Sequence, residues 1–430
     1  MKRFASLPAA LFLLLVSQSA GAQVCKDEAE DAHSLRSHAR LGDRPNARGR
    51  RTSATHLPAA AARGGQNVQV NDPQAFYPDG LIGRAEPTIA ADESGMRLLA
   101  AWVDFQGLCG LVIDCTPPPS PGLTGFAFST DGGRTWTDGG SPPVLENSLT
   151  AFDPWADRGG KDKKTFYLST NSNDLTTGAP GVNVFRGHFA DKGFHWEDLH
   201  VIYPANPDDA FDRDTIVMAK DGSGMGYLSV ANFIGECSQS FFGWGQIEVF
   251  RTRDGGDSWQ GPVIVSPDVT FITDPADPNC GLTGINQQGA QPVIGPGGEV
   301  YVAWRFGPRQ DLDSTGITAE MSASRSLDGG ASFGPRVPIT QKNSLFFDPP
   351  VGYSKAMIAD FPRVAVADSG PHKGRVYVVF ASPVAPVSDA PLFPCPDPYS
   401  GSTCQEQVLT SAQAFLSFSD DRALTWSQPL

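Results

Sequence analysis

The sequence lacks the features that mark several large protein classes. It has only seven histidines and no C-x-x-C or H-E-x-x-H motif, which leaves a zinc site or a Ser-His-Asp triad with little support. Beyond the N-terminal segment, no apolar run is long enough to span a bilayer. Charged residues make up only 19%, and acidic ones dominate: the chain carries −14 overall and +5 in residues 1–63, which leaves −19 for residues 64–430. This balance argues against nucleic acid and anionic membrane surfaces as partners.

The N-terminal segment has the composition of an export signal. Lys2 and Arg3 precede an apolar run over residues 11–16 and an Ala20-Gly21-Ala22 cleavage site. We therefore predict a signal peptide over 1–22 and a secreted or periplasmic protein. Residues 23–63 are basic and rich in Ala, Arg and His, which predicts a disordered tail ahead of the body at 64–430.

The seven cysteines fit an oxidising compartment. Cys25 falls in the tail, where its role is open. The other six form neighbouring sets that predict three disulfides, the last of them by elimination: Cys109–Cys115, Cys395–Cys404 and Cys237–Cys280.

One short sequence motif, which we call the repeated phrase, occurs five times. Its best copy is STDGGRTW at 129–136, and the period of 60 to 93 residues predicts a stack of supersecondary units. Asp accepts hydrogen bonds from backbone N–H groups in a tight turn, Gly supplies positive φ, and the terminal aromatic covers the core edge between sheets. The Asp and aromatic positions are Asp131 and Trp136, Asp191 and Trp196 (a worn copy), Asp254 and Trp259, Asp328 and Phe333, and Asp421 and Trp426.

This phrase resembles the Asp box (BNR repeat), S-x-D-x-G-x-T-W, of the sialidase-superfamily β-propellers, including bacterial exo-alpha-sialidase-like proteins. The resemblance covers residues 84 to 430 and makes the box a structural motif, its Asp not a catalytic carboxylate. Two strand-like runs precede each box, a third leads into it and a fourth follows it. The fold class expected is all-β, a propeller of four-stranded antiparallel blades. Five blades are legible, starting near 86, 152, 212, 290 and 360.

The last blade is unfinished in the sequence, and two explanations stay open. The run 67–70 (NVQV) supplies the missing outer strand, or the chain is part of a longer protein with the six blades that sialidases have. Long insertions fall on the face opposite the boxes, where loops on a rigid scaffold usually build a binding site. One of them, 231–246, carries Trp244, a stacking platform for sugar rings or a residue that packs the loop on its blade.

The first residues of the innermost strands are polar and lie on that same face. They predict a ring of carboxylates with interleaved arginines, in which Glu86, Asp212 and Asp360 are candidate catalytic groups. Crowded carboxylates raise one another's pKa and provide acid–base pairs for glycoside hydrolysis. Such a ring is also suited to holding Ca²⁺, or merely to capping strand starts. The metal site is unknown, and no cofactor is required.

Sialidases hold the substrate carboxylate with three arginines, the first in an F/Y-R-I-P motif. Here the segment reads Gly83-Arg84-Ala85-Glu86-Pro87, with the arginine displaced by one residue, and such a slip turns a strand side chain to the other face. Asp104 stands where the resemblance implies the second arginine, and the nucleophilic tyrosine is not identifiable. The candidate substrate-binding residues are Arg84, Arg213, Arg305, Arg363 and Trp244.

Three functions follow. We expect an exported sialidase-like propeller that recognises a glycan or glycoprotein through its loop-rich face. The alternatives are an active exo-alpha-sialidase or other glycoside hydrolase, and a protein-binding assembly scaffold. The sequence does not separate them, and it leaves the oligomeric state open.

Overall fold

The computed structural model describes fifteen stretches of the chain, and every regular element within them is a β-strand. They are residues 68, 70, 84–104, 122–143, 148–150, 152–174, 177, 179–191, 193–206, 209–233, 245–266, 285–308, 318–343, 361–383 and 412–430. The predicted signal peptide, the whole of the predicted tail at 23–63 and all seven cysteines lie outside the described residues.

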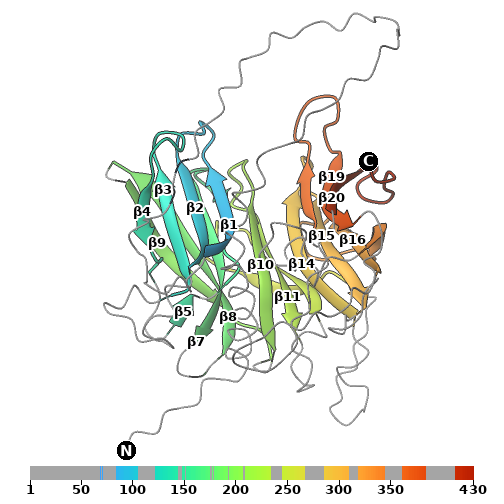
Figure 1. The fold of residues 1–430 in the computed structure, drawn as a ribbon, viewed down its shortest axis with the longest axis horizontal. Coiled ribbons are helices and arrows are strands. Elements are labelled where there is room, and N and C mark those ends of the chain that lie inside the picture. The colour runs from blue at the N-terminus through green and yellow to red at the C-terminus, as the bar shows by residue number, and fades with distance from the viewer. Residues whose placement is uncertain are drawn as a thin grey trace, which may run out of the picture.

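The strands form five antiparallel sheets arranged in chain order, which we call blades one to five (Figure 1). Blade one contains β1 (Arg84–Ala91), β2 (Leu98–Asp104), β3 (Thr124–Ser129) and β4 (Thr137–Gly140). In blade two the first strand is split in two, and both parts pair with the same neighbour. Its strands are β5 (Ser148–Thr150), β6 (Trp155–Gly159), β7 (Thr165–Asp174), β8 (Pro180–Ala190) and β9 (Gly193–Ile202).

The remaining blades repeat this plan. Blade three contains β10 (Ala210–Met218), β11 (Gly226–Phe233), β12 (Gly245–Thr252) and β13 (Gln260–Ile264). Blade four contains β14 (Ile285–Ile294), β15 (Val300–Pro308), β16 (Thr318–Ser326) and β17 (Val337–Asn343). Blade five contains β18 (Arg363–Val366), β19 (Val376–Pro383) and β20 (Ala412–Ser419). The predicted fold, an all-β propeller of antiparallel sheets, is confirmed.

Hydrophobic cores lie between consecutive blades, which is why the middle strands read as near-continuous apolar runs. All eight residues of β11 are buried, whereas the outermost β13 is largely exposed. One cluster joins each pair of neighbours: blades one and two, two and three, three and four, and four and five. Each blade is therefore stabilised mainly by the blades beside it.

The turns that carry the repeated phrase are built alike in blades one, three, four and five. In blade four, Ser326 Oγ donates to Asp328 Oδ1 (2.6 Å) and accepts the N–H of Gly330 (2.8 Å). Asp328 also accepts from the N–H and the hydroxyl of Ser332 (3.0 and 2.6 Å). Both glycines take positive φ, at 68° and 75°. In blade five, Arg422 and Ala423 adopt the same left-handed conformation.

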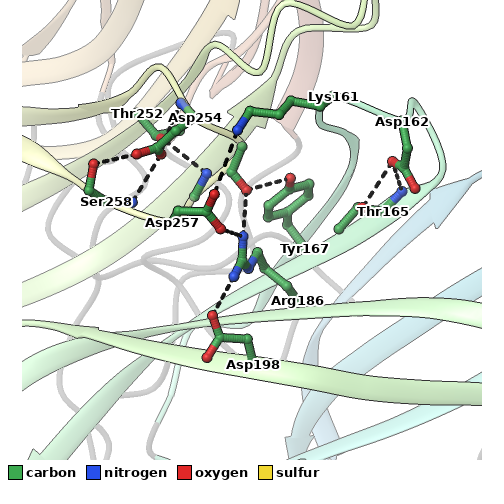
Figure 2. A network of polar contacts seen from close by, with 12 residues as sticks. Lys161, Asp162, Thr165, Tyr167, Arg186, Asp198, Thr252, Asp254, Asp257 and Ser258 are labelled. Atoms are coloured by element: carbon green, nitrogen blue, oxygen red, sulfur yellow. Dashed lines mark hydrogen bonds and ion pairs between the residues drawn. The ribbon is translucent and has the colours of Figure 1, made fainter.

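Each of the last three turns rests on the preceding blade. In the blade-three turn, Gly255 O accepts hydrogen bonds from the Tyr167 hydroxyl (2.9 Å) and from Arg186 Nη1 (3.1 Å), both on blade two. Arg186 also forms ion pairs with Asp257 and Asp198 (Figure 2). Two further arginines repeat this contact along the chain. They are Arg251, which reaches Gly329 O (3.4 Å), and Arg325, which reaches Arg422 O (2.8 Å).

The structure differs from the sequence expectation at Asp191. Here β8 and β9 form a long hairpin in which Ala190 pairs with Gly193, so Asp191 sits in a two-residue turn. Phe189 and His195 stand where the other copies carry hydroxyl side chains, so the bonds that shape those turns cannot form. Trp196 still packs against the core between blades one and two.

The outer edge of blade five is occupied by the last residues of the sequence. Leu430 and Leu416 exchange backbone hydrogen bonds (3.0 and 3.2 Å), and the N–H of Ser427 donates to Phe418 O (2.8 Å). This is the edge at which the first of the two explanations placed residues 67–70 as the missing outer strand. Among the described residues there is also no helix long and apolar enough to cross a membrane.

Candidate functional site

The innermost strands of neighbouring blades begin at the end opposite the Asp-box turns, and three of them share an unusual backbone. Glu86, Asp153 and Arg213 have left-handed φ values of 53°, 56° and 54°, and Gly289 takes 65° in blade four. The ladder shifts register beside this position in β1, β10 and β14. A left-handed non-glycine residue is strained, and such strain is concentrated at functional sites.

The three strained residues form one ion-pair network across blades one to three. Arg213 Nη1 lies 3.0 Å from Glu86 Oε1 and also bonds Asp153 Oδ1. The backbone N–H of Asp153 donates to Glu86 Oε2 (3.2 Å), and Asn171 Nδ2 donates to Asp153 Oδ2 (3.1 Å). The Arg213, Glu86 and Asp153 side chains are only 11%, 6% and 6% exposed, so water screens these charges weakly.

Asp212 lies beside this network in a different protonation state. Desolvation raises the pKa of its carboxyl to about 8, and the negative charge of Asp153 adds to the shift while Arg213 opposes it. Gln288 Nε2 donates to Asp212 Oδ2 (3.2 Å). Asp212 is partly exposed to solvent. At neutral pH the site therefore holds a protonated carboxyl next to two ion-paired carboxylates.

Blade five contributes a second arginine to the same end. Arg363 is solvent-exposed but bordered by protein, and its guanidinium lies 5.1 Å from the ring centroid of Trp155 in blade two. Desolvation and the like charge of Arg213 lower the pKa of Arg363. Phe361 lies under the Arg213 guanidinium at 5.2 Å, and its ring fills the space where a side chain at Gly289 would stand. Residues of all five blades thus meet here.

The predicted site residues divide into three groups. Glu86, Asp212, Arg213 and Arg363 come together, whereas Arg305 is buried inside blade four, opposite Gln288 in the register of β14 and β15. The backbone of Arg84 pairs with that of Asp104, and its side chain is not described. Asp360 and Trp244 lie outside the described residues.

Three further residues complete the site: Asp153, Asn171 and Gln288. Asp153 belongs to the polar strand starts that predicted the ring of carboxylates, but nothing in its Asp-Pro context marked it as a candidate catalytic group. Asn171 and Gln288 carry no sequence signal, because their contacts come from strands more than fifteen residues away. Within the described stretches no group of three or more His, Cys, Asp or Glu is placed to hold a metal ion. The Ca²⁺ site remains a prediction.

Comparison with known proteins gives similarity in fold only. No family model matches the chain, and no curated protein matches it by sequence. A Fusarium graminearum alpha-L-arabinofuranosidase aligns with a TM-score of 0.48 and 16% identity, over 84% of this chain and 86% of that one. A Penicillium chrysogenum alpha-L-arabinanase gives 0.45 and 14% over 80% of each chain. A Trypanosoma rangeli sialidase gives 0.40 and 13% over 79% of this chain and 46% of its own.

Proposed function

We propose that this protein is an exported glycoside hydrolase, with Asp212 as general acid and the Arg213-bound carboxylates Glu86 and Asp153 beside it. The observation that carries the proposal is the position of Asp212, a carboxyl whose pKa burial raises, beside two carboxylates that are ion-paired with Arg213 at a strained, largely buried site. Glycoside hydrolysis needs one carboxylic acid to protonate the leaving oxygen and one carboxylate as base or nucleophile. The acid must still hold its proton at the working pH, as burial and Asp153 make Asp212 do.

The arrangement favours an uncharged sugar over an acidic one. Arg213 already pairs with two carboxylates, so it has little remaining attraction for a substrate anion. Arg363 rests on Trp155, and a guanidinium on an aromatic plane offers a surface for a sugar ring as well as a charge. The acidic body of the protein also repels anionic substrates at a distance.

The test is hydrolysis of fluorogenic glycosides, with neutral arabinofuranosides and anionic sialosides as first probes. We expect turnover of a neutral glycoside, a loss of about 10²-fold or more in Asp212→Asn, and a decline of kcat/KM above about pH 8 as Asp212 loses its proton. Glu197→Gln, an exposed carboxyl-to-amide change on blade two, is the control that should keep full activity.

A second function is favoured by one feature. Arg213 holds both Glu86 and Asp153 in ion pairs, which makes these carboxylates less available as base or nucleophile, as in a propeller that only binds glycans. Glycan binding by wild type with no turnover of any probe would establish the binding function and reject the hydrolase. Efficient sialoside turnover that Arg363→Ala abolishes would instead show that the substrate is anionic.

A further inference from the structure

The faces that blades two and three turn toward each other are divided into an apolar and a polar part. Tyr167, Ile216, Val230 and Phe250 belong to one buried cluster between these blades. Residues two apart on a strand share a face. The next positions on this face, toward the end that carries the candidate site, are polar: Ser169 and Asn171 on β7, Asp214 on β10, Asn232 on β11 and Glu248 on β12. We call these five residues the polar seam.

The polar seam is almost sealed from solvent and is short of hydrogen-bond donors. Asp214 is 1% exposed and Glu248 5%. In the described part of the chain no hydrogen-bond partner reaches six of its oxygens: Ser169 Oγ, Asn171 Oδ1, both carboxyl oxygens of Asp214, Asn232 Oδ1 and Glu248 Oε2. Asn232 Nδ2 is already shared between Asp209 Oδ2 and Glu248 Oε1, at 3.0 Å each. The seam therefore contains a surplus of acceptors.

The neighbouring cation Arg213 does not supply the hydrogen-bond donors that the polar seam lacks. Arg213, next to Asp214 in the chain, is held by Glu86 and Asp153. An ionised carboxylate left buried without a partner costs several kcal/mol, and a bound proton removes that charge and adds a donor. We propose that Asp214 and Glu248 are carried as neutral carboxylic acids, and that their ionisation loosens the contact between blades two and three. The polar seam is then a pH-sensitive joint.

The electrostatics of the surrounding groups agree with this assignment. Burial raises the pKa of Asp214 well above its ordinary value; the nearby Ser169 hydroxyl partly offsets this rise, and Asp153 and Asp212 add to it. Burial likewise raises the pKa of Glu248 to about 7, with an offset from Asn232 and a further rise from Asp209. The titratable and charged groups facing the seam are thus Asp153 from blade two, and Asp209, Asp212 and Arg213 from blade three.

Ionisation of Glu248 and Asp214 makes the stability of the folded state depend on pH. An unfolded Glu ionises near its ordinary 4.5, whereas folded Glu248 holds its proton up to about 7. Between these values the folded state binds the extra proton, so its stability is highest at the acidic end and falls as pH rises through 7. Asp214 acts in the same direction.

Hydrogen exchange, corrected for the intrinsic pH dependence of the amides, tests the proposal on the full chain. Protection of β7, β10 and β11 in wild type should fall about tenfold or more, relative to β15 and β16, between about pH 5.5 and 8.5. Glu248→Gln and Asp214→Asn, measured separately, should each retain more of that protection at the higher pH. The control Glu197→Gln should behave as wild type.

Three results would overturn the proposal. The first is equal protection of wild type at both pH values, and the second is a pH response that neither variant reduces. The third is loss of protection at about pH 5.5 after dialysis against a chelator, since the missing positive charge would then be a metal ion. If either variant fails to fold, the infrared band of protonated carboxyl groups in Asp212→Asn decides, because this protein lacks the proton of Asp212. Absence of the band at about pH 5.5 would then show that Asp214 and Glu248 are both ionised. None of these readouts depends on the protein being a hydrolase.

Discussion

Glu86, Asp153 and Arg213 show how a costly backbone conformation places functional side chains. Each has a left-handed φ close to the start of the innermost strand of its blade. This irregular backbone brings the three charged groups to one location. The ion pairs between them compensate the cost of the left-handed conformation. Sequence inspection could select polar residues at strand starts, but it could not detect the irregular backbone, because no residue type is specific for it.

Protonation of Asp212 should make the stability of the whole protein depend on pH. Folded Asp212 keeps its proton up to about pH 8, whereas unfolded Asp ionises near 3.8. Between these values stability falls as pH rises, because the folded state binds more protons. Asp212→Asn removes this dependence, so its free energy of unfolding should fall less than that of wild type between about pH 5 and 8.5. Urea unfolding at both pH values measures the difference; parallel curves for the two proteins would contradict it.

Ser326 tests the turn chemistry. Its hydroxyl is the acceptor for the buried N–H of Gly330 and a donor to Asp328. Ser326→Ala leaves that N–H unsatisfied and should lower the free energy of unfolding by about 1–3 kcal/mol. Ser94→Ala, in an exposed turn of blade one, is the matched control and should cost less. Equal losses in chemical denaturation would show that the buried turn needs no hydroxyl.

At the scale of elements, the tyrosine on the second strand of a blade packs against the turn of the next. A methyl group at Gly330 would stand 2.6 Å from the Tyr227 ring, whereas one at Gly298 would meet nothing within 4 Å. Both glycines have positive φ, 75° and 85°, so alanine costs similar backbone strain at each. Gly330→Ala should therefore lose about 1–3 kcal/mol more than Gly298→Ala in thermal or urea unfolding. Equal losses would mean that the contact between the blades relaxes freely.

Element types were predictable from the sequence and element contacts were not. The repeated phrase located the turns, because Asp, Gly and hydroxyl residues at fixed spacing dictate local hydrogen bonds. It failed at Asp191, where Phe189 and His195 remove the hydroxyls and β8 continues into a plain hairpin. The arginines that bridge blades, such as Arg186, gave no signal, since their partners lie about 70 residues away.

At the scale of the whole molecule, five sheets enclose four separate cores instead of one. The sequence predicted the order of the sheets through its period. It did not predict that the space between blades two and three would be polar at one end, because a buried acid and an exposed acid look the same in a sequence. Asp214 follows Arg213 at a polar strand start, and nothing in the sequence marks it as buried.

The contacts between the last three turns and the preceding blades all run in one direction along the chain. Arg186, Arg251 and Arg325 all reach forward along the chain, so blades two, three and four each hold the turn of the next blade. Around these turns each contact links a blade only to the next one, as in a one-dimensional array. At the opposite end, residues of all five blades meet in the candidate site. Loss of Arg186 would therefore loosen the turn of blade three without directly affecting that of blade five, whereas a change at the candidate site would reach several blades at once.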